Sequence, residues 1–131
     1  MNITIETKDL FTVPQGYYLA HCISADFALG AGIAKVFDQV YNMRYKLFRE
    51  YGDYKYCGGD AIIVDNVFNL VTKQKCYHKP TYQSLRESLK SMRDQMEMLA
   101  ITKIAMPRIG SGLDKLNQDM VYDIICDVFK D

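Results

Sequence analysis

The sequence lacks an excess of charge of either sign. Its 131 residues hold 16 lysines and arginines against 16 aspartates and glutamates. A neutral chain creates no global field that draws nucleic acid or an anionic membrane to it, so neither is an expected partner, although a local basic patch is compatible with this balance. No apolar run approaches the roughly 20 residues of a membrane span, and the first residues lack the basic and apolar regions of a signal peptide. We therefore expect a cytoplasmic protein.

Clustered cysteine and histidine are also absent. The two histidines are isolated, no CxxC pair occurs, and the four cysteines are widely scattered: Cys22, Cys57, Cys76 and Cys126. Zinc sites usually bring their ligands closer together in the sequence, so we expect no metal and reduced, partly buried thiols. Cys76 stands near His78 and suggests a nucleophile. Without a third orienting group, a simple thiol is the favoured interpretation.

The familiar nucleotide motifs are missing as well. No GKS or GKT and no complete GxGxxG is present, which argues against hydrolysis of nucleoside triphosphates and against a Rossmann dinucleotide site. Two shorter glycine loops do occur, the first at Gly30-Ala31-Gly32 and the second at Gly110-Ser111-Gly112, each between an apolar run and a helical pattern. Such junctions present backbone N–H groups to an anion. Two of them in so short a chain favour a diphosphate site.

Hydrophobic periodicity predicts one α/β domain over residues 1–131. Apolar runs predict strands at 3–7, 17–24 and 104–106, and a hairpin over 60–71 that turns at Asp65-Asn66. Helical spacing predicts helices from 33 to about 51, from 82 to 99 after a Thr81 cap, and from about 117 to 129. We expect a mixed sheet flanked by helices, with both glycine loops at one rim, where ligands of open α/β sheets bind.

Several polar residues near these loops have two interpretations each. Lys73 ends a strand and is either a nucleophilic amine or a solvated lysine. Asp114 is either a general acid and base or a carboxylate that stabilises the following helix. Asp9 either accepts a hydrogen bond from an amino group such as that of adenine or is a turn aspartate. Arg108 contacts phosphate or solvent, and His21, within an apolar strand, is interpreted as a buried, satisfied histidine.

Five segments together resemble the macrodomain family. In family order they are Ala20-His21-Cys22-Ile23-Ser24, Gly30-Ala31-Gly32-Ile33-Ala34, Thr72-Lys73, His78-Lys79-Pro80-Thr81-Tyr82 and residues 106–116. The resemblance covers residues 8–129 and is closest to the subfamily of the terminal ADP-ribose protein glycohydrolase. It implies a three-layer α/β/α sandwich around a mixed, mostly parallel-centred sheet that binds ADP-ribose.

The resemblance also implies a reaction. Lys73 matches the lysine that attacks the anomeric carbon of the distal ribose, and Asp114 matches the acid that handles protons and helps to resolve the lysine adduct. ADP-ribose is thereby released from glutamate or aspartate on proteins, or from O-acetyl-ADP-ribose, without metal or cofactor. The sequence says little about the oligomeric state, and we take a monomer as the default. The ligand-binding residues carried over by position are Asp9 and Leu10 on the adenine side, Ser24 on the distal side, Thr72 beside the lysine, Gly30, Ala31, Gly32, Ile33 and Ala34 in one loop, and Arg108, Ile109, Gly110, Ser111, Gly112 and Leu113 in the other.

The chain departs from the family pattern at two places. Lys8-Asp9-Leu10 stands where relatives usually have Gly-Asp-Leu, which keeps the carboxylate but alters the adenine-side turn. Relatives finish with a strand after the last helix, whereas this chain stops at Lys130-Asp131, so we expect a sheet one strand short or an incomplete adenosine wall.

Two alternatives stand beside the ester hydrolase. One is a module that binds ADP-ribose without turnover. The other is a hydrolase that removes ADP-ribose from nucleic acid, as in related antitoxin macrodomains. Those relatives share the lysine but generally not the acid, so Asp114 favours protein or small-ester substrates.

Overall fold

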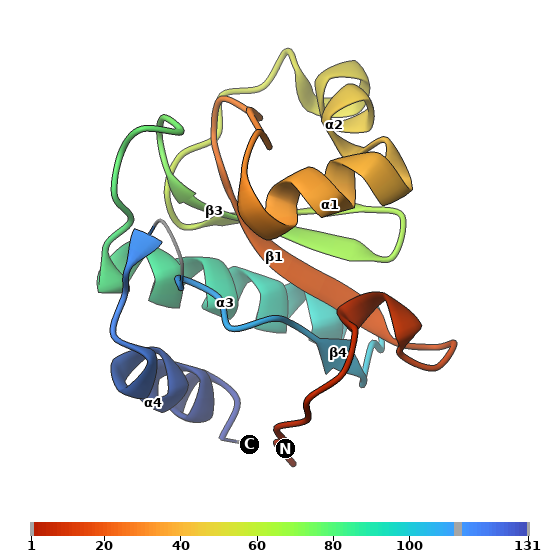
Figure 1. Cartoon of the computed structure of the whole chain (residues 1–131), viewed down its shortest axis with the longest axis vertical. Helices are drawn as coiled ribbons and strands as arrows, with labels where there is room; N and C mark the ends of the chain where they lie inside the picture. Colours follow the sequence, from red (N-terminus) through yellow and green to blue (C-terminus); the bar gives the residue numbers. More distant parts are fainter. Residues whose placement is uncertain (1, 112–113, 131) are drawn as a thin grey trace.

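The computed structural model describes residues 2–111 and 114–130. Its elements are η1 (a 3-10 helix, Leu10–Thr12), β1 (Tyr18–Ser24), α1 (Gly32–Tyr41), α2 (Met43–Tyr51), β2 (Asp60–Val64), β3 (Val67–Lys73), α3 (Tyr82–Met98), β4 (Ile104–Ala105) and α4 (Gln118–Val128). The strands form one sheet in the order β2-β3-β1-β4 (Figure 1). β1 runs parallel to β3 and β4, and β2 pairs antiparallel with β3 through the predicted turn, where Asp65 has φ 53°.

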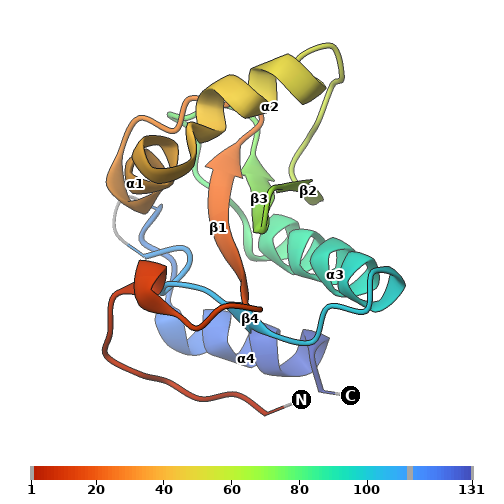
Figure 2. The ribbon, with the colours of Figure 1, turned by 90° about the vertical axis from the view of Figure 1, so that its right-hand side faces the viewer.

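Helices cover both faces of the sheet. α1 and α2 lie on one face, and α3 and α4 lie on the other, as the two perpendicular views show (Figures 1 and 2). β1 and β3 are buried on both faces, which explains why both read as nearly continuous apolar runs. The predicted α/β sandwich around a mixed sheet is therefore confirmed. No helix within the described residues combines the length and apolarity needed to cross a bilayer.

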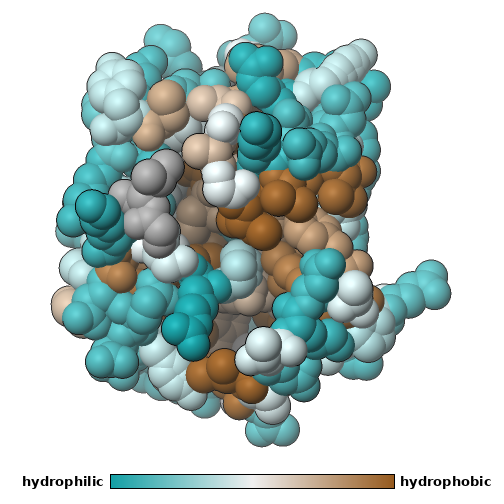
Figure 3. All heavy atoms as spheres, viewed as in Figure 1, coloured by the Kyte–Doolittle hydropathy of each residue, from teal (hydrophilic) through white to brown (hydrophobic). Residues whose placement is uncertain are grey.

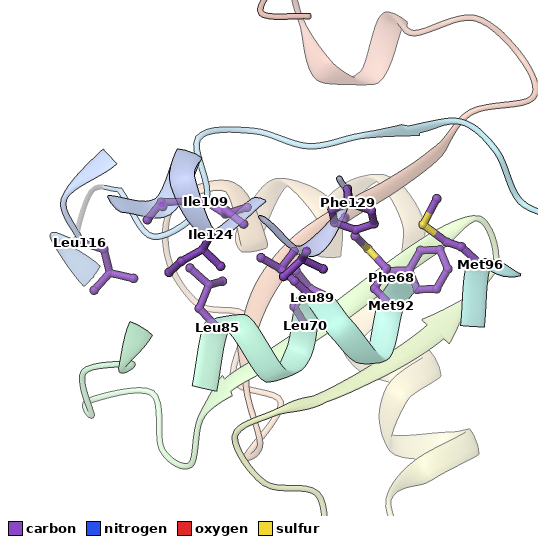
Figure 4. Packing of buried hydrophobic residues seen from close by; sticks show 13 residues of the cluster. Phe68, Leu70, Leu85, Leu89, Met92, Met96, Ile109, Leu116, Ile124 and Phe129 are labelled. Atoms are coloured by element: carbon purple, nitrogen blue, oxygen red, sulfur yellow. The ribbon is translucent and has the colours of Figure 1, made fainter. Parts of the chain in front are cut away.

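The larger core fills the space between the sheet and the α3–α4 layer (Figure 4). Phe68 and Leu70 of β3 pack there with Leu85, Leu89 and Met92 of α3. On the opposite face, a second cluster joins the sheet to α1 and α2, with buried members Leu19, Ile23, Phe27, Leu29, Phe37, Met43, Leu47, Ile62, Val64, Val67 and Val71. The sheet is thus held from both sides, which makes the carboxyl ends of β1 and β3 a firm base for a site.

α3 forms as its periodicity predicts. The Thr81 side chain accepts a hydrogen bond from Ser84 N–H at 2.9 Å, and the Ser84 hydroxyl accepts one from Thr81 N–H, which completes a capping box. Its apolar positions recur every three or four residues and face the sheet. The helix ends at Met98, one residue before the predicted end, and Leu99 is 57% exposed.

Two predicted elements differ in the structure. Residues 3–7 form no strand, and Ile5 is 75% exposed. The alternating pattern was not enough, because a strand needs a partner edge for its backbone. The single helix expected from 33 to about 51 is two helices, because Asn42 takes the left-handed conformation with φ 56°. Asp38 supports the break, since its carboxylate accepts a hydrogen bond from Arg44 N–H at 2.9 Å. Asparagine tolerates this conformation better than most residues.

His21 is buried, as its apolar strand predicts, but it is only half satisfied, because its Nδ1 has no hydrogen-bond partner among the described residues. Its Nε2 lies 2.6 Å from Asn69 Oδ1, and its ring stacks on Phe37 with centroids 3.9 Å apart. Asn69 donates its Nδ2 to Ile62 O at 3.1 Å, so its Oδ1 is the acceptor and His21 carries its proton on Nε2. Burial lowers the pKa of His21 to about 4, although the hydrogen bond to Asn69 works in the opposite direction. The ring is therefore neutral at pH 7.

This burial predicts a pH dependence of stability. The unfolded chain binds a proton at His21 below the ordinary pKa of about 6.5, whereas the folded chain does so only near 4. The contribution of His21 is therefore complete above pH 6.5 and is lost as the pH falls towards 4. Between pH 7.5 and pH 5 we expect the free energy of unfolding, measured in urea, to fall by about 2 kcal/mol from this group.

The matched control is the second histidine, His78, which is exposed. His21→Gln should flatten the profile between pH 7.5 and pH 5, whereas His78→Gln should leave its slope unchanged. Equal slopes in both variants and the wild type would show that His21 is not the titrating group.

Candidate active site

The site is built where the pairing between β1 and β3 slips by one residue. Ile23 pairs with Val71, but Ser24 pairs with Lys73, so that Thr72 is the extra residue. Ala25 N–H continues the pairing beyond the slip by donating to Lys73 O at 2.9 Å. Irregular pairing of this kind re-aims a side chain next to active sites. Here the slip lies next to Lys73, which the sequence identified as the candidate nucleophile.

Lys73 and Asp114 are brought together across 41 residues of sequence. Lys73 Nζ donates to Asp114 Oδ1 at 2.9 Å, and the two side chains are only 16% and 17% exposed. Every other ion pair among the described residues has both side chains more than one-quarter exposed. Partial burial of an amine and a carboxylate in contact is typical of a reactive pair, although structural pairs also show it.

The loop between β1 and α1 is held in an unusual backbone conformation. Phe27 and Leu29 have φ of 54° and 44°, and both side chains are buried in the α1–α2 core. A positive φ is costly for such residues and persists only where the surrounding structure imposes it. Gly32 (φ 59°) then begins α1, and Ala31 at the N-cap supplies no side chain to the first-turn N–H groups. These donors are available to an anion.

The second glycine loop is held in place by its buried residues. Ile109 and Gly110 are buried, whereas Arg108 and Ser111 are exposed, and the Ser111 hydroxyl donates to Arg108 O at 2.6 Å. Gly110 has φ 76°, and a Cβ at this position would lie 2.7 Å from Leu116 Cδ1. Only glycine fits there. The predicted residues Gly112 and Leu113 lie outside the described part of the chain.

The surface around this rim is hollowed. Figure 3 shows a recess next to the grey atoms, with apolar side chains on the side where Figure 1 places α1. Two apolar side chains of α1, Ile33 and Val40, are 38% and 56% exposed. Two further open hollows, of about 400 and 570 Å³, are lined by residues of α3, α4 and the N-terminal segment and include neither Lys73 nor Asp114. The candidate site is therefore identified by the contact between Lys73 and Asp114 and not by the size of a hollow.

The other residues predicted to bind the ligand differ in their burial and hydrogen bonds. Asp9 is exposed and caps η1 by accepting from Phe11 N–H at 3.0 Å, which is the turn role, while Leu10 packs against the α1–α2 core. Ser24 and Thr72 are buried beside the slip, and Thr72 Oγ1 has no hydrogen-bond partner among the described residues. Of the first loop, Gly30 to Ile33 are exposed.

The cysteines near the site are not activated. Burial, followed by the negative charge of Asp114, raises the pKa of Cys22 to about 12, so this thiol stays protonated. Cys76 is exposed, and the nearby His78 uses Nδ1 to accept from Lys75 N–H at 3.2 Å. This arrangement gives no support to a Cys76–His78 nucleophile. No group of side chains among the described residues is suited to hold a metal ion.

One residue of the site was missed in the sequence. Asp26 accepts hydrogen bonds from the Ser24 hydroxyl, from Ala28 N–H at 3.2 Å and from Cys76 N–H at 3.0 Å. The Ser24-Ala25-Asp26-Phe27-Ala28 segment carried a weak signal, because an aspartate often accepts from the backbone N–H two residues later. The contact with Cys76 left no such signal.

Comparison with known proteins decides the family. No family model matches the chain. Over 131 residues the sequence is 39% identical to ADP-ribose glycohydrolase OARD1 from Bos taurus and 37% identical to that from Homo sapiens, covering 98% of this chain and 84% of each relative. The macrodomain of Mycobacterium tuberculosis DarG superposes with a TM-score of 0.88 at 20% identity, covering 97% of this chain and 89% of that one. The chain belongs to the OARD1 family of macrodomains.

The macrodomain identity agrees with the geometry. The sheet with helices on both faces is the fold shared with DarG. Within this macrodomain, the two glycine loops and the Lys73–Asp114 pair come from the same end of the sheet, after β1, after β3 and after β4. The two residues described after α4, Phe129 and Lys130, form no strand.

Proposed function

We propose that this macrodomain binds ADP-ribose and hydrolyses ADP-ribosyl esters. The substrates are mono-ADP-ribose on glutamate or aspartate of proteins, and O-acetyl-ADP-ribose. The observation that carries the proposal is the contact between Lys73 Nζ and Asp114 Oδ1 at 2.9 Å, largely shielded from solvent at the end of the sheet from which the two glycine loops also come. The names of the OARD1 relatives, at 39% and 37% identity, support glycohydrolase activity. We further propose a monomer that acts in the cytoplasm.

The pair suits a two-step reaction. Asp114 accepts a proton from the Lys73 ammonium, and the free amine then attacks the anomeric carbon of the distal ribose. A C–N bond forms as the C–O bond to the ester breaks, and the carboxylate leaves with the bonding electrons. Water, with Asp114 moving the protons, then cleaves the lysine adduct, so that ADP-ribose is released and the Lys73 amine is regenerated. No metal or cofactor takes part.

The leaving group explains the preference for esters. A carboxylate departs as a stable anion and needs no proton from the protein. A serine ether oxygen or a base nitrogen needs a proton as it leaves, so Asp114 would have to pass on the proton that it takes from Lys73. This difference favours ester substrates over a hydrolase of ADP-ribosylated nucleic acid, and the absence of net charge favours them too.

Recognition of the diphosphate falls to the two loops. The uncapped first turn of α1, after Ala31, offers N–H groups and the positive end of the helix dipole. The exposed guanidinium of Arg108 adds donors on the opposite loop. Asp9 is proposed for the adenine side, with part of its acceptor capacity already used by Phe11 N–H.

A panel of linkages tests the function. The wild-type chain is incubated separately with protein ADP-ribosylated on glutamate, protein ADP-ribosylated on serine, an ADP-ribosylated DNA strand and O-acetyl-ADP-ribose, and free ADP-ribose is followed. We expect release from the glutamate ester and from O-acetyl-ADP-ribose alone. Release from DNA but not from either ester would show instead that the chain is a hydrolase of ADP-ribosylated nucleic acid. No release at all, with ADP-ribose binding seen by calorimetry, would make the chain a reader module.

A further inference from the structure

Asp26 connects two segments of the site that are far apart in the sequence. It follows β1, where Oδ1 accepts from the Ser24 hydroxyl and from Ala28 N–H at 3.2 Å. Its other oxygen, Oδ2, accepts from Cys76 N–H at 3.0 Å, 50 residues away and three residues after Lys73. One partly buried carboxylate therefore ties the loop that leads to the first glycine loop to the segment that follows the candidate nucleophile.

The segment after Lys73 has little else to hold it in place. Residues 74–79 are all exposed. Besides the bond to Asp26, a hydrogen bond from Gln74 Nε2 to Tyr56 O at 3.0 Å joins this segment to the rest of the chain. Lys75 and His78 bond to each other within the segment. The bond from Cys76 N–H thus sets where this segment lies against the loop after β1.

The same carboxylate decides what Ser24 offers to a ligand. A hydroxyl has one proton to donate and two lone pairs that accept. Because the Ser24 proton is directed to Asp26, its oxygen is left with lone pairs. A ligand group that meets Ser24 must then be a donor, such as a sugar hydroxyl, and a phosphate oxygen is excluded. Asp26 is ionised for this role: partial burial works to raise its pKa, but the bonds from Ser24, Cys76 N–H and Ala28 N–H together hold it below its usual value.

We propose that Asp26 is a positioning residue of this site, which orients the Ser24 hydroxyl as an acceptor for a ribose hydroxyl and holds the segment after Lys73 against the loop after β1. In its catalytic consequence this inference rests on the proposed hydrolase function. Asp26 touches neither Lys73 nor Asp114 through a hydrogen bond of its own, so it acts through Ser24 and the backbone.

Asp26→Asn tests the proposal, because it keeps the shape of the side chain but turns one acceptor oxygen into a donor. We expect kcat on the glutamate-linked substrate to fall by about 10- to 100-fold with a smaller change in KM, since misplacement of reacting groups lowers the rate of chemistry. The matched control is Asp38→Asn, which alters an aspartate that also accepts a backbone N–H, from Arg44, outside the site. A merely structural role predicts equal kcat and equal changes in Tm for the two variants, and that result would overturn the proposal.

A double-mutant cycle with Ser24→Ala separates this proposal from the hydrolase function. If Asp26 acts largely through Ser24, the two substitutions are not additive, and the double variant is within about threefold of the poorer single variant. The cycle is measured on kcat/KM if the wild type turns over, and on the Kd for ADP-ribose if it only binds. Additive effects in the measured quantity, or no effect of Asp26→Asn, would reject the positioning role in either case.

Amide hydrogen exchange tests the contacts of Asp26 in the wild-type protein, so this measurement does not depend on whether a variant folds. Ala28 and Cys76 N–H should exchange at least about tenfold more slowly than Tyr77 N–H in the same exposed segment, because Asp26 holds the first two. Equal exchange at all three amides would show that the carboxylate does not bind them in solution.

Discussion

Lys73→Ala is expected to lower the release of ADP-ribose from a glutamate-linked protein by about 10³-fold or more, because it removes the proposed nucleophile. Binding of free ADP-ribose, measured by calorimetry, should change far less, since the loops that hold the diphosphate are untouched. A drop in turnover with binding retained is the signature of a residue that acts in chemistry. A reader module would instead show no turnover in either form and the same affinity in both.

The chain offers a matched control for this substitution. Lys46 forms an ion pair with Asp65 at 2.6 Å near the β2–β3 turn, and its side chain is 29% exposed. Lys46→Ala therefore removes a lysine from an ion pair outside the site, and its turnover should stay within about twofold of the wild type. Wild-type turnover by Lys73→Ala would contradict the proposed mechanism, however well the variant binds.

Asp114→Ala is expected to lower turnover by about 10²- to 10³-fold, the range typical of a general acid or base. The carboxylate is 2.9 Å from Lys73 and 17% exposed, so the variant also leaves a partly buried ammonium without its partner. Asp114→Asn distinguishes the two effects, because an amide oxygen still accepts a hydrogen bond from Lys73 but cannot take its proton. Turnover should be low in both variants, whereas the Asn variant should keep more of the wild-type Tm.

The Lys73→Ala/Asp114→Ala double variant asks whether the two residues act as a unit. In the proposed mechanism Asp114 acts on the proton and the adduct of Lys73, so the double variant should be no slower than Lys73→Ala alone. Asp127→Ala, which removes an exposed carboxylate paired with partly exposed Arg86, serves as the control and should leave turnover unchanged. Multiplication of the two single effects would mean that Lys73 and Asp114 contribute independently, and the mechanism would need another base.

Local patterns carried much of the fold. The apolar stripe of α3, its Thr81 cap and the turn at Asp65-Asn66 all depend on residues within a few positions of one another, and all three are present in the structure. The failures have equally physical causes. The pattern of residues 3–7 alternates but finds no partner strand, and the apolar period continues past Asn42 although its backbone turns to φ 56°.

For the site, the resemblance to macrodomains singled out Lys73, Asp114 and the two glycine loops, and the relatives establish the family. Their roles in this chain stay predictions that the variants above address. Residue identity and local order are written in the sequence, so the loops, the caps and the candidate nucleophile could be named from it. The contact of Lys73 with Asp114 joins residues 41 positions apart, and that of Asp26 with Cys76 joins residues 50 positions apart. Such contacts depend on the register slip between β1 and β3 and on the parallel order of the strands, which arise only when distant segments pack into one sheet.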